Sequence, residues 1–320
     1  MSSVLITGGL GFIGSHVSRE FLNRGYNVIL MDITDDKKLI KDIEGRVEIV
    51  KGDITNNETV NRIFKKYKPN IVVHYAALLS AAAESKPDLG YQVNFNGMWN
   101  IFDAARKADS DILVFASSIA AYGPGVPEVV KEDTYTIPQT LYGISKQVGE
   151  MLGIWFNKKY GIKFVAFRYA SVIGPGRRDG GASAYSTLII QKPAQGEPYV
   201  INVPEDAKIP IAYVKDVAFI TVYTCENIAR AKSKIYNVAS FYESPTAAEI
   251  VTSVKKVIPN AKLTFKPDPS ITEIVRSWPK NVDMQRIKTE LNWKPKYGEL
   301  DLLVADFINE VRNNPDIFYI

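Results

Sequence analysis

VLITGGLGFIG, residues 4–14, is an apolar run that stops at a glycine and passes into a helical pattern. Gly8, Gly11 and Gly14 give the spacing G-x-x-G-x-x-G. Glycines at such a strand-to-helix junction allow a tight turn and a close approach of the backbone to a phosphate, while the N–H groups of the helix N-terminus attract negative charge. The stretch therefore predicts a phosphate-binding loop between a strand and a helix.

Outward from this loop, short apolar runs alternate with amphipathic stretches through the first half of the chain. The runs at 71–76 and 112–116 are apolar enough for strands that are buried on both faces. This alternation predicts an α/β fold with a doubly wound parallel sheet of the Rossmann type. We expect strands at 4–7, 27–31, 47–50, 71–76, 112–116 and 163–168, and helices at 12–23, 57–67, 87–107, 139–160 and 300–313.

The regular alternation weakens after the sixth predicted strand. Residues 174–181 are rich in glycine and arginine, which is typical of a loop. We therefore expect two parts. The first is a Rossmann domain of residues 1–170 plus about 217–239, and the second is a smaller C-terminal substrate lobe of about 171–216 and 240–320.

Asp32 ends the second predicted strand, downstream of the glycine loop. A carboxylate at this place can accept hydrogen bonds from both hydroxyls of an adenosine ribose, and it would repel a 2′-phosphate. The sequence therefore predicts NAD, and not NADP, as the cofactor.

The composition excludes several other classes of protein. The formal net charge is only +4, with acidic residues interspersed among the lysines, so nucleic-acid binding is not expected. One cysteine and two histidines cannot form a Cys/His zinc site, and no apolar run is long enough to span a bilayer. We expect a cytoplasmic enzyme for a small-molecule substrate, without a metal or a membrane partner, in which His16 and His74 are structural.

The other motifs, in order, resemble those of the extended short-chain dehydrogenases/reductases, the NAD-dependent epimerase/dehydratase family. Beside the glycine loop, the segments that carry the resemblance are GDI at 52–54, HYAA at 74–77, VNFNG at 93–97, SSIAAYG at 117–123, YGISK at 142–146, and RY at 168–169 with GPG at 174–176.

The resemblance implies a cofactor site and an assembly. Two of the helices, at 87–107 and 139–160, would pair across a two-fold axis as a four-helix bundle, which makes a homodimer. The two helices also carry more apolar residues than one face packed on the sheet would require, which supports this pairing. These residues are Phe95, Trp99, Phe102, Met151, Leu152, Trp155 and Phe156. The residues expected to hold NAD are Gly8, Gly11, Phe12, Ile13, Gly14, Asp32, Ile33, Asp53, Ile54, Tyr75, Ala76, Ala77, Asn94, Tyr142, Lys146 and Tyr169.

Tyr142, Lys146 and Ser118 are the candidate catalytic residues. Tyrosine is a poor base at neutral pH, but a lysine four residues later on the same helix face favours the phenolate. Tyr142 can then take a proton from a substrate hydroxyl while hydride leaves the carbon for NAD. Lys146 would also hold the nicotinamide ribose, and Ser118 would orient the reacting oxygen.

Two positions depart from the nucleotide-sugar members of the family. Ser171 stands where an asparagine is common, and Ile209 stands where an arginine is common, so polar contacts to a diphosphate are lost. Other segments resemble short-chain L-threonine 3-dehydrogenases and D-erythronate-type sugar-acid dehydrogenases. They are ALLS at 77–80 with KP at 86–87, IQKP at 190–193, PDP at 267–269 and SWP at 277–279 with Asp283; in contrast, GGASAY at 180–185 departs from the GGTTDY loop of the threonine enzymes.

We predict NAD-dependent oxidation of a secondary hydroxyl on a small polar acid of the L-threonine or sugar-acid type. Two alternatives remain: an NAD-dependent nucleotide-sugar epimerase of the UDP-glucose 4-epimerase type or a dehydratase, and a non-catalytic NAD-binding sensor. Arg177, Arg178 and Lys192 are candidate partners for a substrate carboxylate. The expected substrate contacts are Ser80, Ser118, Ser171, Ser183 and Trp278, with Trp278 in a lid.

Overall fold

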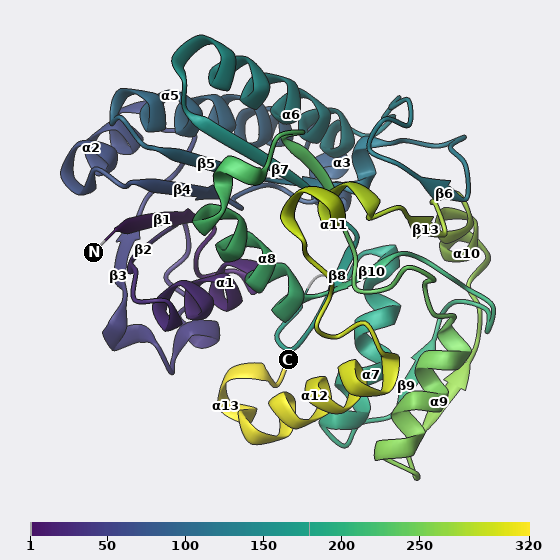
Figure 1. The fold of residues 1–320 in the computed structure, drawn as a ribbon. Coiled ribbons are helices and arrows are strands. Elements are labelled where there is room, and N and C mark those ends of the chain that lie inside the picture. The colour runs from purple at the N-terminus through teal and green to yellow at the C-terminus, as the bar shows by residue number, and fades with distance from the viewer. Residues whose placement is uncertain (1, 179) are drawn as a thin grey trace.

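A seven-stranded parallel sheet forms the centre of the computed structural model, which describes residues 2–178 and 180–320 (Figure 1). The strand order is β11-β7-β5-β4-β1-β2-β3. The bounds are β1 (Ser3–Thr7), β2 (Asn27–Asp32), β3 (Glu48–Lys51), β4 (Ile71–His74), β5 (Ile112–Ser118), β7 (Lys163–Tyr169) and β11 (Ile235–Val238). The order reverses between β1 and β4, and in doubly wound sheets a ligand binds outside the carboxyl ends of the strands at such a point.

Helices cover both faces of this sheet. In Figure 1, α2 (Asn57–Tyr67), α5 (Met98–Lys107) and α6 (Leu141–Tyr160) lie above it, and α1 (Phe12–Asn23) and α8 (Val214–Glu226) lie below it. Alternation along β5 supplies both layers, because Leu113 and Phe115 pack toward α5 and α6, whereas Val114 and Ala116 join the opposite core. The predicted doubly wound α/β architecture is confirmed.

The predicted helix at 87–107 has a wide turn in its middle. It consists of α4 (Pro87–Tyr91), a π-helical turn at Gln92–Gly97, and α5. The turn coincides with two tertiary constraints: Gly97 packs against Ile54, and Asn94 bonds the backbone of Leu78. Single π turns often occur at functional sites.

A smaller group of elements follows β7 and lies at the lower right in Figure 1. Its helices α7 (Tyr185–Ala194), α9 (Ala247–Val257) and α12 (Leu300–Asn313) pack on one another. Two short parallel pairs accompany them: β8 (Ser171–Ile173) with β10 (Ile211–Tyr213), and β9 (Tyr199–Ile201) with β12 (Leu263–Phe265). The remaining helices are α3 (Ser80–Ser85), α10 (Pro269–Arg276), α11 (Gln285–Leu291) and α13 (Pro315–Phe318), with 3₁₀ turns at Lys38–Ile40, Glu44–Arg46, Ile119–Ala121, Ala182–Ala184 and Ile228–Arg230.

The two parts of the chain are joined by contacts that cross the proposed boundary. The segment 217–239 returns to the large sheet, since α8 packs on α1 and β11 pairs with β7. In the opposite direction, β6 (Val129–Val130) pairs with β13 (Asn281–Val282). One apolar cluster also runs from Val4 to Phe318. None of the helices in the described ranges is long and apolar enough to cross a membrane.

Candidate active site

The glycine loop lies at the switch point between β1 and β4. Gly8 has a φ of +68°, which favours glycine, and a Cβ on Gly14 would lie 2.3 Å from the carbonyl oxygen of Gly8. The N-cap of α1 is Gly11, which has no side chain to cap the first N–H groups of the helix. Because these N–H groups need acceptors, the loop fits a pyrophosphate; the expected contacts Phe12, Ile13 and Gly14 form the first turn of this helix.

Asp32 ends β2 beside this loop. Its Oδ2 accepts a hydrogen bond from the backbone N–H of Leu10 at 3.0 Å, and its Oδ1 accepts one from Thr34 at 3.2 Å. These two bonds fix the carboxylate and leave further lone pairs for ribose hydroxyls. The next side chain, Ile33, which is also an expected cofactor contact, is 65% exposed.

The expected contacts Asp53 and Ile54 lie at the carboxyl end of β3. Asp53 accepts two bonds from Thr55, one from the N–H and one from the hydroxyl, each at 2.8 Å. Ile54 is buried against Gly97, so its side chain packs on the π-helical turn that precedes α5. Any contact of Ile54 with an adenine therefore has to come from its backbone.

Three expected cofactor residues direct their polar groups into the protein. The hydroxyls of Tyr75 and Tyr169 lie 3.2 Å apart, and each bonds Thr221 Oγ1, at 3.1 and 2.9 Å. Both ends of the Asn94 amide bond the backbone of Leu78, at 2.7 and 2.9 Å. These side chains position the loop after β4, in which Ala76 donates its N–H to Thr7 Oγ1.

Tyr142 stands in the first turn of α6, where the helix touches the end of β5. Thr140 caps this turn by accepting the N–H of Gly143 at 3.0 Å. A Cβ on Gly143 would lie 2.5 Å from the carbonyl oxygen of Ala120, so the helix and the turn after Ser118 meet without a side chain between them. Ser118 itself caps that turn, because its Oγ accepts the N–H of Ala120 at 3.2 Å. The packing therefore brings the segments of Tyr142 and Ser118 together.

Lys146 lies one turn further along α6 and is only 5% exposed. Its Nζ stands over the rings of Phe115 and Tyr142, 5.0 and 5.1 Å from their centroids. Burial lowers the pKa of Lys146 to about 7, and the charge of Glu150 opposes that change. A buried ammonium bordered by rings is poorly solvated, so the hydroxyls of a nicotinamide ribose would satisfy it. This site and the uncapped start of α1 both fit a dinucleotide.

The expected substrate serines fall into two groups. Ser80 is exposed at the first residue of α3, and α3 contacts α6 through Glu84, which accepts the N–H of Leu141 at 2.7 Å. Ser171 and Ser183 lie in the smaller part of the chain, where Arg177 donates to their hydroxyls at 3.2 and 2.8 Å.

Arg177 is the buried cation of this region. It is 7% exposed and also donates to the carbonyl oxygen of Val172. Arg178 and Lys192 are paired at the surface with Asp36 and Glu197. Among the three candidate carboxylate partners, Arg177 is the one that contacts expected substrate residues, namely Ser171 and Ser183.

Trp278 follows α10, which packs on the turn that carries Ser183. Its side chain is half-buried and contacts the large apolar cluster. Ile209, at the position where an arginine is common in nucleotide-sugar enzymes, is fully buried in the same cluster.

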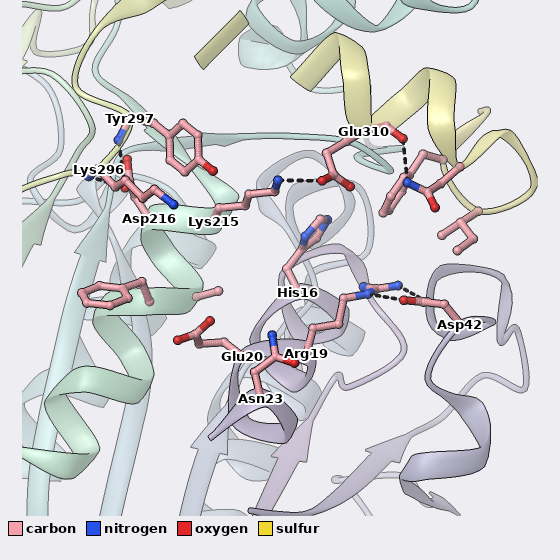
Figure 2. Close-up of a pocket in the computed structure, with 15 residues that line it drawn as sticks. His16, Arg19, Glu20, Asn23, Asp42, Lys215, Asp216, Lys296, Tyr297 and Glu310 are labelled. Carbon is pink, nitrogen blue, oxygen red and sulfur yellow. Dashed lines mark hydrogen bonds and ion pairs between the residues drawn. The ribbon is translucent and has the colours of Figure 1, made fainter. Parts of the chain in front are cut away.

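A separate pocket of about 310 Å³ lies between α1, α8 and the C-terminal helices (Figure 2). Two of its cationic side chains are already paired: Arg19 with Asp42, and Lys215 with Glu310 at 2.7 Å. None of the expected site residues lines it, so the candidate active site lies elsewhere, at the carboxyl edge of the large sheet. Within residues 2–178 and 180–320, no cluster of three or more His, Cys, Asp or Glu could hold a metal ion.

Sequence reasoning missed a buried polar layer beneath α6. Glu150, fully buried, pairs with Arg168 on β7 at 2.7 Å, and Ser117 donates to the same carboxylate at 2.5 Å. The available signal was a glutamate four residues after Lys146 in a helix that packs on a buried strand.

Comparisons with known proteins agree with this geometry. The model of the NAD dependent epimerase/dehydratase family matches residues 4–239. The mitochondrial L-threonine 3-dehydrogenase of Bos taurus is 30% identical over 312 residues, which cover 96% of this chain and 82% of that protein.

Solved structures resemble the chain over nearly its whole length. A GalE-like L-threonine dehydrogenase from Cupriavidus necator, in its holo form, has a TM-score of 0.88 at 27% identity and covers 97% of this chain and 99% of its own. The UDP-glucose 4-epimerase of Thermotoga maritima, solved with UDP-glucose, has a TM-score of 0.81 at 25% identity and covers 97% of this chain and 99% of its own.

Proposed function

We propose that this chain, which belongs to the NAD-dependent epimerase/dehydratase family, oxidises the secondary hydroxyl of a small polar acid of the L-threonine or sugar-acid type. The observation that carries the substrate class is Arg177, a buried cation that bonds the hydroxyls of both Ser171 and Ser183. A fixed guanidinium between hydroxyls is suited to a carboxylate.

NAD would be held by the uncapped start of α1, by Asp32 and by Lys146. When bound, NAD supplies the redox chemistry by accepting a hydrogen with its electron pair from the carbinol carbon. The protein positions the two reactants and manages the proton. Charged Lys146 stabilises the phenolate of Tyr142, which takes the proton of the substrate hydroxyl. Ser118 hydrogen-bonds the oxygen of that hydroxyl and orients it.

The nucleotide-sugar alternative finds less support at the substrate end. Ile209 is fully buried and apolar, so it offers a diphosphate no polar contact, and Ser171 supplies one hydroxyl where an asparagine amide is common in those enzymes. Because the chain is similar to a UDP-glucose 4-epimerase, 4-epimerisation of UDP-sugars is the activity to assay beside dehydrogenation.

A substrate screen tests the proposal. L-Threonine and four-carbon sugar acids are incubated with NAD, and UDP-glucose and UDP-galactose are incubated in parallel. The proposal predicts NADH from at least one hydroxy acid and no interconversion of the UDP-sugars. Efficient 4-epimerisation, with no NADH from any acid, would establish the alternative instead.

Arg177→Gln separates the carboxylate assignment from general loss of fold. The expected result is a KM for the acid raised by about tenfold or more, as for a lost charged hydrogen bond, with little change in NAD affinity. Arg178→Gln, which removes a surface pair with Asp36, is the matched control. An equal effect of both variants on KM would refute the assignment.

We further propose that the protein is a homodimer that pairs through α4, α5 and α6. Phe102 and Phe156 of the predicted apolar set are buried in the chain's own core. In contrast, Trp99, Met151 and Trp155 are between 41% and 52% exposed, and the two indole rings stack at 6.5 Å. An exposed aromatic group of this kind favours an interface.

Light scattering at micromolar concentration measures the assembly directly. We expect a dimeric mass that Met151→Lys shifts toward the monomer, while Val200→Lys, a similarly exposed apolar position on β9, leaves it unchanged. A monomeric mass for the unmodified protein would refute the dimer.

A further inference from the structure

Glu150 is a carboxylate of α6, the helix that carries Tyr142 and Lys146, and it has no exposed side-chain surface. Its Oε1 accepts Arg168 Nε at 2.8 Å, and its Oε2 accepts Arg168 Nη2 at 2.7 Å. Ser117 Oγ donates to Oε1 at 2.5 Å. A buried pair with this geometry neutralises both charges, and breaking it would leave one of them uncompensated.

This pair touches both segments that carry catalytic residues. Tyr142, Lys146 and Glu150 follow one another at four-residue spacing, so they share one face of α6, and that face packs on β5. Ser117 directly precedes Ser118 at the end of β5. The carboxylate therefore joins the helix that carries the base to the strand that carries the orienting hydroxyl.

Arg168 continues the layer toward the rest of the protein. Its Nη1 donates to the carbonyl oxygen of Glu132 at 3.1 Å, and its guanidinium lies over the Tyr122 ring, 4.6 Å from the centroid. These contacts hold the guanidinium of Arg168 in one position, so Glu150 has a partner that cannot easily move.

We propose that Glu150 is a positioning residue for proton transfer: it fixes α6 against the end of β5 and, in balance with Arg168, keeps Lys146 charged beside Tyr142. The expected change in kcat/KM rests on the proposed dehydrogenase function. The expected change in the pKa of Lys146 does not.

The charged and titratable groups around Lys146 determine the sign of the effect. On α6 they are Tyr142 and Glu150; on β7 there is Arg168, behind Glu150; on β4 there is His74, whose pKa burial lowers to about 3, so it is neutral. Glu150 raises the pKa of Lys146 against the effect of burial. Loss of the carboxylate would expose Lys146 to an unbalanced arginine, and loss of the arginine would expose it to an unbalanced carboxylate.

The two single variants should therefore act in opposite directions. In Glu150→Gln the pKa of Lys146 falls, so Lys146 loses its charge at lower pH and the high-pH limb of kcat/KM moves to lower pH. In Arg168→Met the pKa of Lys146 rises. The double variant, which removes both charges, returns it toward the unmodified protein and should fold even if a single variant does not, because neutral replacement of a buried pair is often tolerated.

The readout is the pKa of Lys146, measured by NMR on protein with ¹³C-labelled lysine, with Lys146→Arg to assign the signal. Asp216→Asn is the matched control: it removes another buried carboxylate, one that bonds Ser240 and the N–H of Lys296 and is remote from α6 in sequence. It should leave the pKa of Lys146 unchanged. Kinetic pH profiles of the same variants supply the second readout, because kcat/KM on the high-pH limb changes about tenfold when that limb moves by one pH unit.

Opposite changes of this pKa in the single variants, with recovery in the double variant, support the proposal. Changes in the same direction, or kcat/KM reduced equally at every pH with an unchanged pKa of Lys146, would overturn it. Because the NMR measurement needs no substrate, an absence of NADH from hydroxy acids would count against the proposed function alone.

Discussion

Tyr142 and Lys146 have different expected roles, and substitution can separate them. Tyr142→Phe removes the proton acceptor but keeps the ring beside Lys146, so turnover should fall by at least about 100-fold while NAD affinity stays nearly constant. Lys146→Ala should reduce both, because Lys146 is expected to hold the ribose as well. The measurements are steady-state kinetics and NAD titration by fluorescence. A Tyr142→Phe enzyme with most of its activity would mean that another group is the base.

We expect Asp32 to determine which dinucleotide the loop accepts. Its carboxylate is held by the N–H groups of Leu10 and Thr34, so it cannot turn away from a 2′-phosphate without losing these bonds. We expect NAD to bind more tightly than NADP. In Asp32→Ala the ratio of the two dissociation constants should be smaller. Dissociation constants for both cofactors test this, and tighter NADP binding by the unmodified protein would contradict it.

At the residue scale, the sequence predicts where these groups stand along the chain but not where they point. Asn94, Tyr75 and Tyr169 are in the expected segments, yet their polar atoms bond Leu78 and Thr221. A spacing motif carries no information about side-chain direction, which depends on partners distant in sequence. For the same reason Arg168 could not be paired with Glu150 from the sequence.

At the scale of elements, Gly143 controls how closely α6 approaches the turn after β5. A methyl group there would lie 2.5 Å from the carbonyl oxygen of Ala120. We expect Gly143→Ala to cost about 1–3 kcal/mol in the free energy of unfolding and to reduce kcat through displacement of Tyr142. Gly45→Ala is the control, since its Cβ would meet nothing within 4 Å. Urea unfolding and kinetics measure both effects; equal results for the two variants would refute the close approach as the cause.

Elements with a clear amphipathic stripe and end signals were predicted to the residue. The bounds of α1, α2 and α12 match because their apolar positions repeat at helical spacing. In contrast, α7 was missed: nearly all its residues are buried, so no polar face marks a period. The wide turn within 87–107 follows from contacts with Ile54 and Leu78, which the local sequence does not encode.

At the scale of the whole molecule, two buried histidines link stability to pH. His16 bonds the carbonyl oxygen of Pro175 and His74 bonds Thr7, and burial lowers the pKa of each from 6.5 to about 3. Above pH 6.5 both histidines are neutral in the folded and in the unfolded chain, so they do not change the free energy of unfolding with pH. Below it only the unfolded chain takes up protons, and stability falls by about 1.4 kcal/mol per pH unit for each histidine as the pH approaches 3.

Urea unfolding at a series of pH values between neutral and about pH 5 measures this slope, in a range where most carboxylates keep their charge. His16→Asn and His74→Asn should each remove about half of it. A stability that does not change with pH over this range would show that the histidines are not held neutral in the folded protein.

The proposed reaction removes a hydrogen from a small acid and does not return it. Isotope transfer distinguishes this from epimerisation: L-threonine, or the sugar acid found active, carries deuterium on the carbinol carbon, and mass spectrometry follows cofactor and product. We expect one deuterium in NADH for each molecule oxidised, none in the keto product, and a primary isotope effect on the chemical step. Deuterium that stays on the carbon of a sugar with inverted configuration, with no label in free NADH, would contradict net oxidation.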